Sequence, residues 1–175
     1  MKALIIYESL FGNTKAVAEA VADGLRDTFE VELAEPGSMP PAADRDLLVI
    51  GAPTHAFGLS RPSTRQDAAK RGEIRPGAAD VGIREYLDVS PLLPNLPAAA
   101  FDTRVNKPRL PGSAARKAHR RLRRLGCRLV SSPTSFWVTG TEGPLLEGEL
   151  ERAREWGVRL AAAARGTTSK QDLRP

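Results

Sequence analysis

The chain opens with the arrangement that most restricts its fold: an apolar run, a short loop and a long amphipathic segment. Residues 3–7 are apolar throughout and bounded by polar residues, which is typical of a strand covered on both faces in a parallel sheet. A six-residue loop, residues 9–14, follows. Apolar residues then recur every three or four positions over residues 14–26, which predicts an amphipathic helix. A strand, a loop and a helix therefore begin an α/β fold.

The rest of the sequence continues this alternation. Further strands are predicted at residues 29–33, 47–50, 96–101 and 129–138, the last interrupted by Pro133. Helices are predicted within residues 61–88 and at residues 113–125 and 147–164. The alternation predicts an α/β protein with a doubly wound five-stranded parallel sheet, a three-layer α/β/α sandwich. We expect one domain over residues 1–165 and a disordered polar tail over residues 166–175.

Length and cysteine content narrow the class of protein further. A chain of 175 residues can bury a substantial core without covalent cross-links. Cys127 is the only cysteine, which excludes an intrachain disulfide and any zinc or iron–sulfur site built from several cysteines. This usage favours a reducing compartment, so we expect a cytoplasmic protein, and we expect no metal site. The first apolar run is too short for a signal peptide or a membrane span.

In doubly wound sheets, ligands bind beyond the carboxyl ends of the strands, where the winding direction reverses. Three loops are predicted at that edge, at residues 8–14, 52–60 and 102–112. The sequence contains neither G-x-x-x-x-G-K-[ST], which binds nucleoside triphosphates, nor G-x-G-x-x-G, which binds dinucleotides. These loops are therefore where a different ligand should bind.

The first loop has the properties of an anion site. Its backbone N–H groups and the dipole of the following helix point toward one place. Ser9, Asn13 and Thr14 add side-chain donors, and Gly12 permits a close approach of the backbone to a ligand. The alternative is that Asn13 and Thr14 only cap the helix. The strand and helix on either side favour phosphate binding.

The pattern I-I-Y-E-S-x-x-G-x-T at residues 5–14 resembles the signature of the flavodoxin family. The resemblance implies a flavodoxin-like fold that binds flavin mononucleotide (FMN) non-covalently. It places the FMN phosphate in the first loop, at Ser9, Leu10, Phe11, Gly12, Asn13 and Thr14. Phe11 replaces a hydroxyl residue often found in small electron-carrying flavodoxins. An aromatic residue there is similar to flavodoxin-like quinone reductases and to the flavin domains of diiron flavoproteins.

The second loop resembles the segment that lines the isoalloxazine ring in flavodoxins. The resemblance implies that the backbone of this loop touches the flavin and that two side chains cover a ring face. The residues concerned are Pro53, Thr54, His55, Phe57 and Gly58, with His55 and Phe57 as the covering side chains. The alternative is that Phe57 anchors the loop in the core and His55 is solvated.

The third loop resembles the part of flavodoxins that binds the pyrimidine edge of the flavin. Asp102 and Thr103 stand at that position. The tyrosine that usually stacks on the ring is absent from this loop, so the second ring face is either open or covered by Arg104. An open ring face is what an enzyme needs to admit a substrate or a hydride donor. It is less suited to an electron carrier, whose flavin is sealed. No catalytic residue is assigned.

Three functions remain open from the sequence. The first is an FMN-dependent redox protein that passes electrons to or from a partner protein or a small acceptor. The second is a flavoenzyme similar to flavodoxin-like quinone reductases or protoporphyrinogen oxidases. The third is a flavodoxin-like fold without cofactor that serves as a binding module.

The positive charge of the chain is concentrated in one segment. Residues 104–128 contain ten Lys or Arg and no Asp or Glu, although the net charge of the whole chain is only +5. We expect the helix within this segment to dock an acidic redox partner or an anionic substrate near Arg116 to Arg124. The alternative is a solvated surface. Nucleic acid is not expected as a partner, because the segment lacks interleaved aromatic residues.

Overall fold

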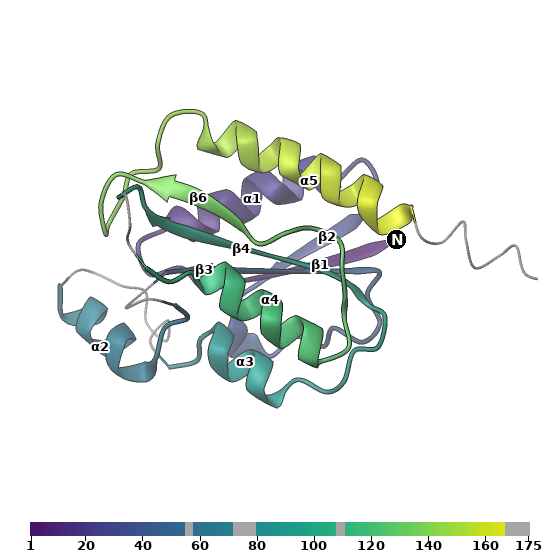
Figure 1. Ribbon diagram of the computed structural model, residues 1–175, viewed down its shortest axis with the longest axis horizontal. Coiled ribbons are helices and arrows are strands. Elements are labelled where there is room, and N and C mark those ends of the chain that lie inside the picture. Colours follow the sequence, from purple (N-terminus) through teal and green to yellow (C-terminus); the bar gives the residue numbers. More distant parts are fainter. Residues whose placement is uncertain (55–57, 72–79, 108–110, 167–175) are drawn as a thin grey trace, which may run out of the picture.

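The computed structural model describes residues 1–54, 58–71, 80–107 and 111–166 (Figure 1). The expected tail, apart from Gly166, and the candidate residues His55 and Phe57 lie outside these residues. The strands are β1 (Lys2–Tyr7), β2 (Glu30–Ala34), β3 (Leu47–Pro53), β4 (Pro97–Val105), β5 (Arg128–Leu129) and β6 (Thr134–Val138). The helices are α1 (Asn13–Leu25), the short 3-10 helix η1 (Pro36–Ser38), α2 (Pro62–Arg71), α3 (Ile83–Val89), α4 (Ala114–Arg124) and α5 (Glu149–Arg165).

The strands form one parallel sheet in the order β2-β1-β3-β4-β5, with β6 also paired with β4. β5 pairs with the first two residues of β4, and β6 pairs with residues Phe101 to Val105. β5 and β6 are therefore two parts of one edge strand, interrupted near Pro133, which has no N–H to donate to the ladder. The predicted five-stranded, doubly wound sheet is confirmed, and its order reverses between β1 and β3.

Helices cover both faces of the sheet. Figure 1 shows α1 and α5 on one face and α3 and α4 on the other, while α2 lies at the end of the molecule where β6 ends. Each face has its own apolar core, and the central strands β1 and β3 contribute to both. On the α1 and α5 face, the rings of Phe101, Phe136 and Trp156 meet edge to face at centroid distances of 5.8 to 6.0 Å.

Glycines allow α1 and α5 to cross closely. A Cβ atom on Gly24 would lie 2.0 Å from the carbonyl oxygen of Arg154, and one on Gly157 would lie 2.4 Å from that of Val21. Both contacts are with backbone atoms, which cannot move aside as a side chain end can. The two helices can therefore approach this closely only because both positions lack a side chain.

β4 is longer than the sequence predicts, which changes the setting of three candidate site residues. The strand was expected to end at Phe101, and Asp102, Thr103 and Arg104 were expected in a loop. They are strand residues, because β6 continues the parallel pairing beside them from Asp102 to Val105. Their side chains are therefore held by the sheet.

Candidate functional site

The first loop joins β1 to α1 through a left-handed glycine. Gly12 has a φ of +90°, a conformation that favours glycine, and a Cβ there would meet nothing within 4 Å. The glycine is therefore required by the backbone angle and not by crowding. It stands at the position before α1 and has no side chain to cap the helix.

Ser9 takes over the capping of α1. Its hydroxyl oxygen accepts hydrogen bonds from the N–H groups of Gly12, at 3.1 Å, and Lys15, at 3.2 Å. A serine hydroxyl has one hydrogen in addition to these lone pairs, so that hydrogen can still be donated to a ligand. Asn13 and Thr14 do not cap the helix with their side chains.

Asn13 and Thr14 instead connect the first loop to neighbouring segments. The Asn13 side chain donates to the carbonyl oxygen of Glu142 at 3.0 Å, and the hydroxyls of Thr14 and Thr103 lie 2.8 Å apart and are buried. In the described part of the chain, the N–H groups of Asn13 and Thr14 have no hydrogen-bond partner. Because these groups belong to the first turn of a 13-residue helix, they point outward at its positive end.

An open pocket lies beside these donors. Its volume of about 70 Å³ exceeds the roughly 10–15 Å³ that a single water needs. Predicted site residues of all three loops line it: every residue of the first loop except Gly12, then Pro53, Thr54, Thr103 and Arg104. The sequence did not point to three further lining residues, Val105, Val138 and Thr141. The tertiary structure therefore brings the described parts of the three predicted loops to one pocket.

Thr54 connects the second loop to the start of α4. Its N–H donates to the carbonyl oxygen of Thr103 at 2.9 Å. Its hydroxyl donates to Asp102 Oδ2 and accepts from the N–H of Ala114, both at 2.9 Å. The beginning of α4 therefore contacts a residue that lines the pocket, as expected for a helix near the rim of the site.

Asp102 is fully buried and does not line the pocket. Its Oδ2 accepts hydrogen bonds from the Ser113 hydroxyl at 2.6 Å and the Ala115 N–H at 3.0 Å, in addition to Thr54. The carboxylate thus stabilises the N-terminal end of α4, where Ser113 caps the helix as the sequence predicts. Its other oxygen, Oδ1, is buried and has no hydrogen-bond partner among the residues that the structure describes.

Arg104 lies against an aromatic ring at the edge of the pocket. Its guanidinium carbon is 5.5 Å from the centroid of the Trp137 ring, which β6 places beside it. Trp156 is buried in the core, whereas Trp137 is only partly buried. The sequence gives no sign of the pair, because the two residues meet only through the pairing of β4 with β6.

Helix α4 presents four exposed arginines: Arg116, Arg120, Arg123 and Arg124. Arg121, by contrast, is half-buried: it forms an ion pair with Asp88 and donates to the carbonyl oxygen of Arg84. The Lys117 side chain lies against Gly58, where a Cβ atom would be 2.3 Å from its Nζ. The basic surface is therefore smaller than the sequence suggests.

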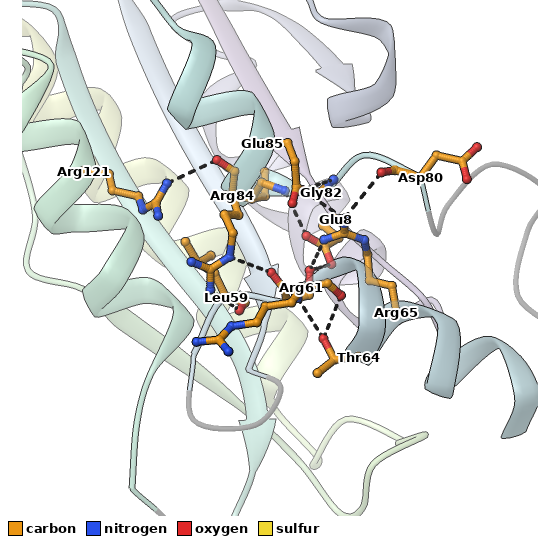
Figure 2. Close-up of polar contacts among 12 residues, drawn as sticks. Glu8, Leu59, Arg61, Thr64, Arg65, Asp80, Gly82, Arg84, Glu85 and Arg121 are labelled. Atoms are coloured by element: carbon orange, nitrogen blue, oxygen red, sulfur yellow. Dashed lines mark hydrogen bonds and ion pairs between the residues drawn. The ribbon is translucent and has the colours of Figure 1, made fainter.

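A buried polar cluster next to the first loop was missed by sequence reasoning. Glu8, Ser60 and Arg65 are almost fully buried, and Glu85 completes the group (Figure 2). We call these four residues the Glu8 cluster. Arg65 lies in a polar helical stretch, where an arginine normally faces solvent, so its burial could not be foreseen.

Other chemical groups in the described residues do not form a second site. Burial raises the pKa of the Cys127 thiol to about 11, which makes the reactive thiolate scarce at neutral pH. No group of three or more His, Cys, Asp or Glu side chains within the described ranges could hold a metal ion. The helices that the structure describes are all too short or too polar to cross a membrane.

No family model matches the sequence, and neither does any curated protein. Solved structures do match. A flavodoxin from the domain Archaea superposes with a TM-score of 0.65 at 18% identity, covering 94% of this chain and 99% of that chain. Flavodoxin 1 from Bacillus cereus has a TM-score of 0.66 at 20% identity, over 93% of this chain and 98% of its own.

A third match is a WrbA-like flavodoxin from Agrobacterium tumefaciens, with a TM-score of 0.59 at 20% identity, over 94% of this chain and 97% of its own. These matches cover nearly the whole length of both proteins in each pair. The chain therefore has the flavodoxin-like fold that the resemblance of the first loop implies.

Proposed function

We propose that this protein binds FMN and passes electrons to or from a partner protein or a small acceptor. The observation that carries the proposal is the anion site at the start of α1. There the N–H groups of Asn13 and Thr14, which no described residue pairs, and the donor-capable hydroxyl of Ser9 adjoin one pocket. The flavodoxin-like fold supports the same ligand, because it places this loop at the point where the strand order reverses.

The residues present fit the parts of FMN. The first loop offers N–H and hydroxyl donors to the phosphate. Asp102 would contribute only indirectly, because it is fully buried and holds Thr54, which lines the pocket, through its Oδ2. Arg104 and the backbone after Pro53 would flank the ring. When bound, FMN would supply the one- and two-electron chemistry that the protein itself lacks.

The four exposed arginines of α4 support an acidic partner or an anionic substrate. Ala114, the first residue of α4, donates its N–H to the hydroxyl of Thr54, a residue of the pocket, so the positive field of the helix lies close to the proposed cofactor. A positive rim raises the rate of encounter with negative partners. A reducing compartment such as the cytoplasm suits a chain with one buried cysteine.

A flavoenzyme of quinone-reductase or protoporphyrinogen-oxidase type is the second candidate. It is favoured by Arg104, which lines the pocket where flavodoxins usually place a tyrosine on the ring. An arginine there is a binding group for an anionic substrate as well as a wall of the site. Consumption of NADPH with a quinone acceptor would separate this candidate from a carrier.

An absorption spectrum of the purified protein tests the proposal. We expect flavin absorbance, or its appearance when the apoprotein is mixed with FMN and passed through a desalting column. Riboflavin, which lacks the phosphate, should be retained less well. A protein that takes up neither compound would contradict the proposal and favour a binding module without cofactor.

A further inference from the structure

The Glu8 cluster joins three segments that are far apart in the sequence. One Glu8 oxygen accepts from the Ile83 N–H at 2.9 Å, and the other accepts from the Ser60 hydroxyl. Arg65 donates to the same Ser60 oxygen at 2.8 Å. Figure 2 shows Glu8, which follows β1, Arg65 of α2 and Glu85 of α3 converging on one place.

The cluster is closely packed. Arg65 also forms an ion pair with Glu85 at 3.0 Å, and Glu85 accepts from the Gly82 N–H at 2.8 Å. A Cβ atom on Gly82 would lie 2.5 Å from Arg65 Nη1 and 2.6 Å from Glu8 Oε2. Glycine therefore lets the backbone before α3 approach the buried charges closely.

A second arginine holds the same segment from its backbone side. Arg84 donates to the carbonyl oxygens of Leu59, at 2.8 Å, and Ser60, at 3.0 Å. Arg121 of α4 in turn donates to the carbonyl oxygen of Arg84 at 3.2 Å. Both the backbone and the side chain of Ser60 are therefore held, the first by Arg84 and the second by Glu8 and Arg65.

The position of the cluster connects it to the proposed flavin site. Glu8 directly precedes Ser9, whose hydroxyl organises the first loop. Ser60 lies two residues after Gly58, at the end of the second loop. Burying a carboxylate and a guanidinium is costly, and in proteins apolar side chains of similar volume are often at least as stabilising as a buried ion pair. The buried charges of the Glu8 cluster therefore indicate that the end of the second loop must be held in one position.

We propose that Glu8 is a positioning residue: through Ser60 and Arg65 it holds the end of the second loop against the first, and so sets the environment of the flavin ring. The inference rests on the proposed FMN binding and extends it to residues that do not touch the cofactor. Glu8 does not act on the flavin directly. It fixes the distance between the loop that binds the phosphate and the loop beside the ring.

Three variants test the proposal. Glu8→Gln keeps the size of the side chain and removes its charge, and Ser60→Ala removes the link to Arg65 while leaving both charges in place. Glu151→Gln is the matched control, because Glu151 forms an exposed ion pair with Arg154 on α5. If Glu8→Gln fails to fold, Ser60→Ala carries the test.

The main measurement is the midpoint potential of bound FMN together with the dissociation constants of FMN and riboflavin. In Glu8→Gln and Ser60→Ala we expect the ratio of affinities for oxidised and reduced FMN to change roughly tenfold, about 30 mV for a two-electron couple. Glu151→Gln should match the wild type. A variant that carries both Glu8→Gln and Ser60→Ala should change the midpoint potential no more than the stronger single variant does, because both substitutions break the same hydrogen bond between Ser60 and Glu8.

The stability of the apoprotein gives a readout that needs no flavin. Burial raises the pKa of the Glu8 carboxyl, against the hydrogen bonds from Ser60 and Ile83 and the charge of Arg65. Arg65 of α2 and Glu85 of α3 are the charged groups of the cluster that act on it, and Glu35 lines the small pocket beside it.

A carboxyl whose pKa is raised by folding stabilises the protein fully below its unfolded pKa, and this contribution is lost as pH rises through the folded pKa. We therefore expect the free energy of unfolding of the wild type, measured in urea, to fall as the pH rises from the unfolded to the folded pKa of Glu8. This fall should be absent in Glu8→Gln. A fall that persists unchanged in Glu8→Gln would contradict a role of the Glu8 charge in the cluster.

The outcomes separate the two proposals. If the wild type binds FMN and both variants keep its affinities and potential, the positioning role of Glu8 is wrong and the proposed function stands. If the wild type binds no flavin, both are wrong. Shifts in the two variants but not in Glu151→Gln support the positioning role.

Discussion

Removing two hydroxyls from the first loop should separate phosphate binding from ring binding. In Ser9→Ala with Thr14→Ala, the loop loses the hydrogen that Ser9 can donate and the buried hydroxyl that Thr14 shares with Thr103. The backbone donors of Asn13 and Thr14 remain. FMN and riboflavin differ only in the phosphate, so their affinities report the two parts of the site separately.

The size of the effect follows from the number of donors lost. A hydrogen bond to a charged group contributes about 1.5 to 3 kcal/mol, so two such bonds contribute about 3 to 6 kcal/mol. At about 1.4 kcal/mol for each factor of ten, FMN binding should weaken by about 10²- to 10⁴-fold. The affinity for riboflavin should fall much less. Its only expected loss comes from the first loop itself, because the N–H groups of Gly12 and Lys15 no longer have the Ser9 hydroxyl as acceptor.

Fluorescence titration of the apoprotein with each flavin measures both affinities. Ser132→Ala is a suitable control, because Ser132 is exposed between β5 and β6, at the opposite end of β6 from the pocket residue Val138. Equal losses of affinity for FMN and riboflavin would refute the placement of the phosphate in the first loop.

Three further predictions concern the fold and the charged surface. Gly24→Ala should lower the free energy of unfolding in urea by about 1 to 3 kcal/mol, because α1 and α5 must separate; an unchanged midpoint would contradict the close crossing. Asp102→Asn should cost about 1 to 2 kcal/mol by removing the charge at the N-terminus of α4, and thermal unfolding that matches the wild type would argue against this role. Changing Arg116, Arg120 and Arg124 to Glu should slow electron transfer with an acidic partner at low salt and weaken its ionic-strength dependence, with FMN affinity unchanged; wild-type rates at every salt concentration would make these arginines a solvated surface.

Local patterns in the sequence were sufficient for most of the architecture. The first strand is buried on both faces and the first helix on one face, and each of these burial patterns appears in the polarity of a few consecutive residues. A short stretch of sequence is therefore enough to predict them. Ser113 was recognisable as a helix cap for the same reason. The extent of β4 was not, because Asp102 and its neighbours are polar and become strand residues only by pairing with β6.

The first loop illustrates what the sequence determined by itself: its donors, its glycine and its place between a buried strand and a helix are consecutive in the chain. The Glu8 cluster illustrates what only the tertiary structure decided. Glu8 and Ser60 are 52 residues apart, and Arg65 belongs to a polar stretch that by pattern should face water. A charged side chain is buried only where a distant segment supplies its partners, and which segments meet depends on how the whole chain packs.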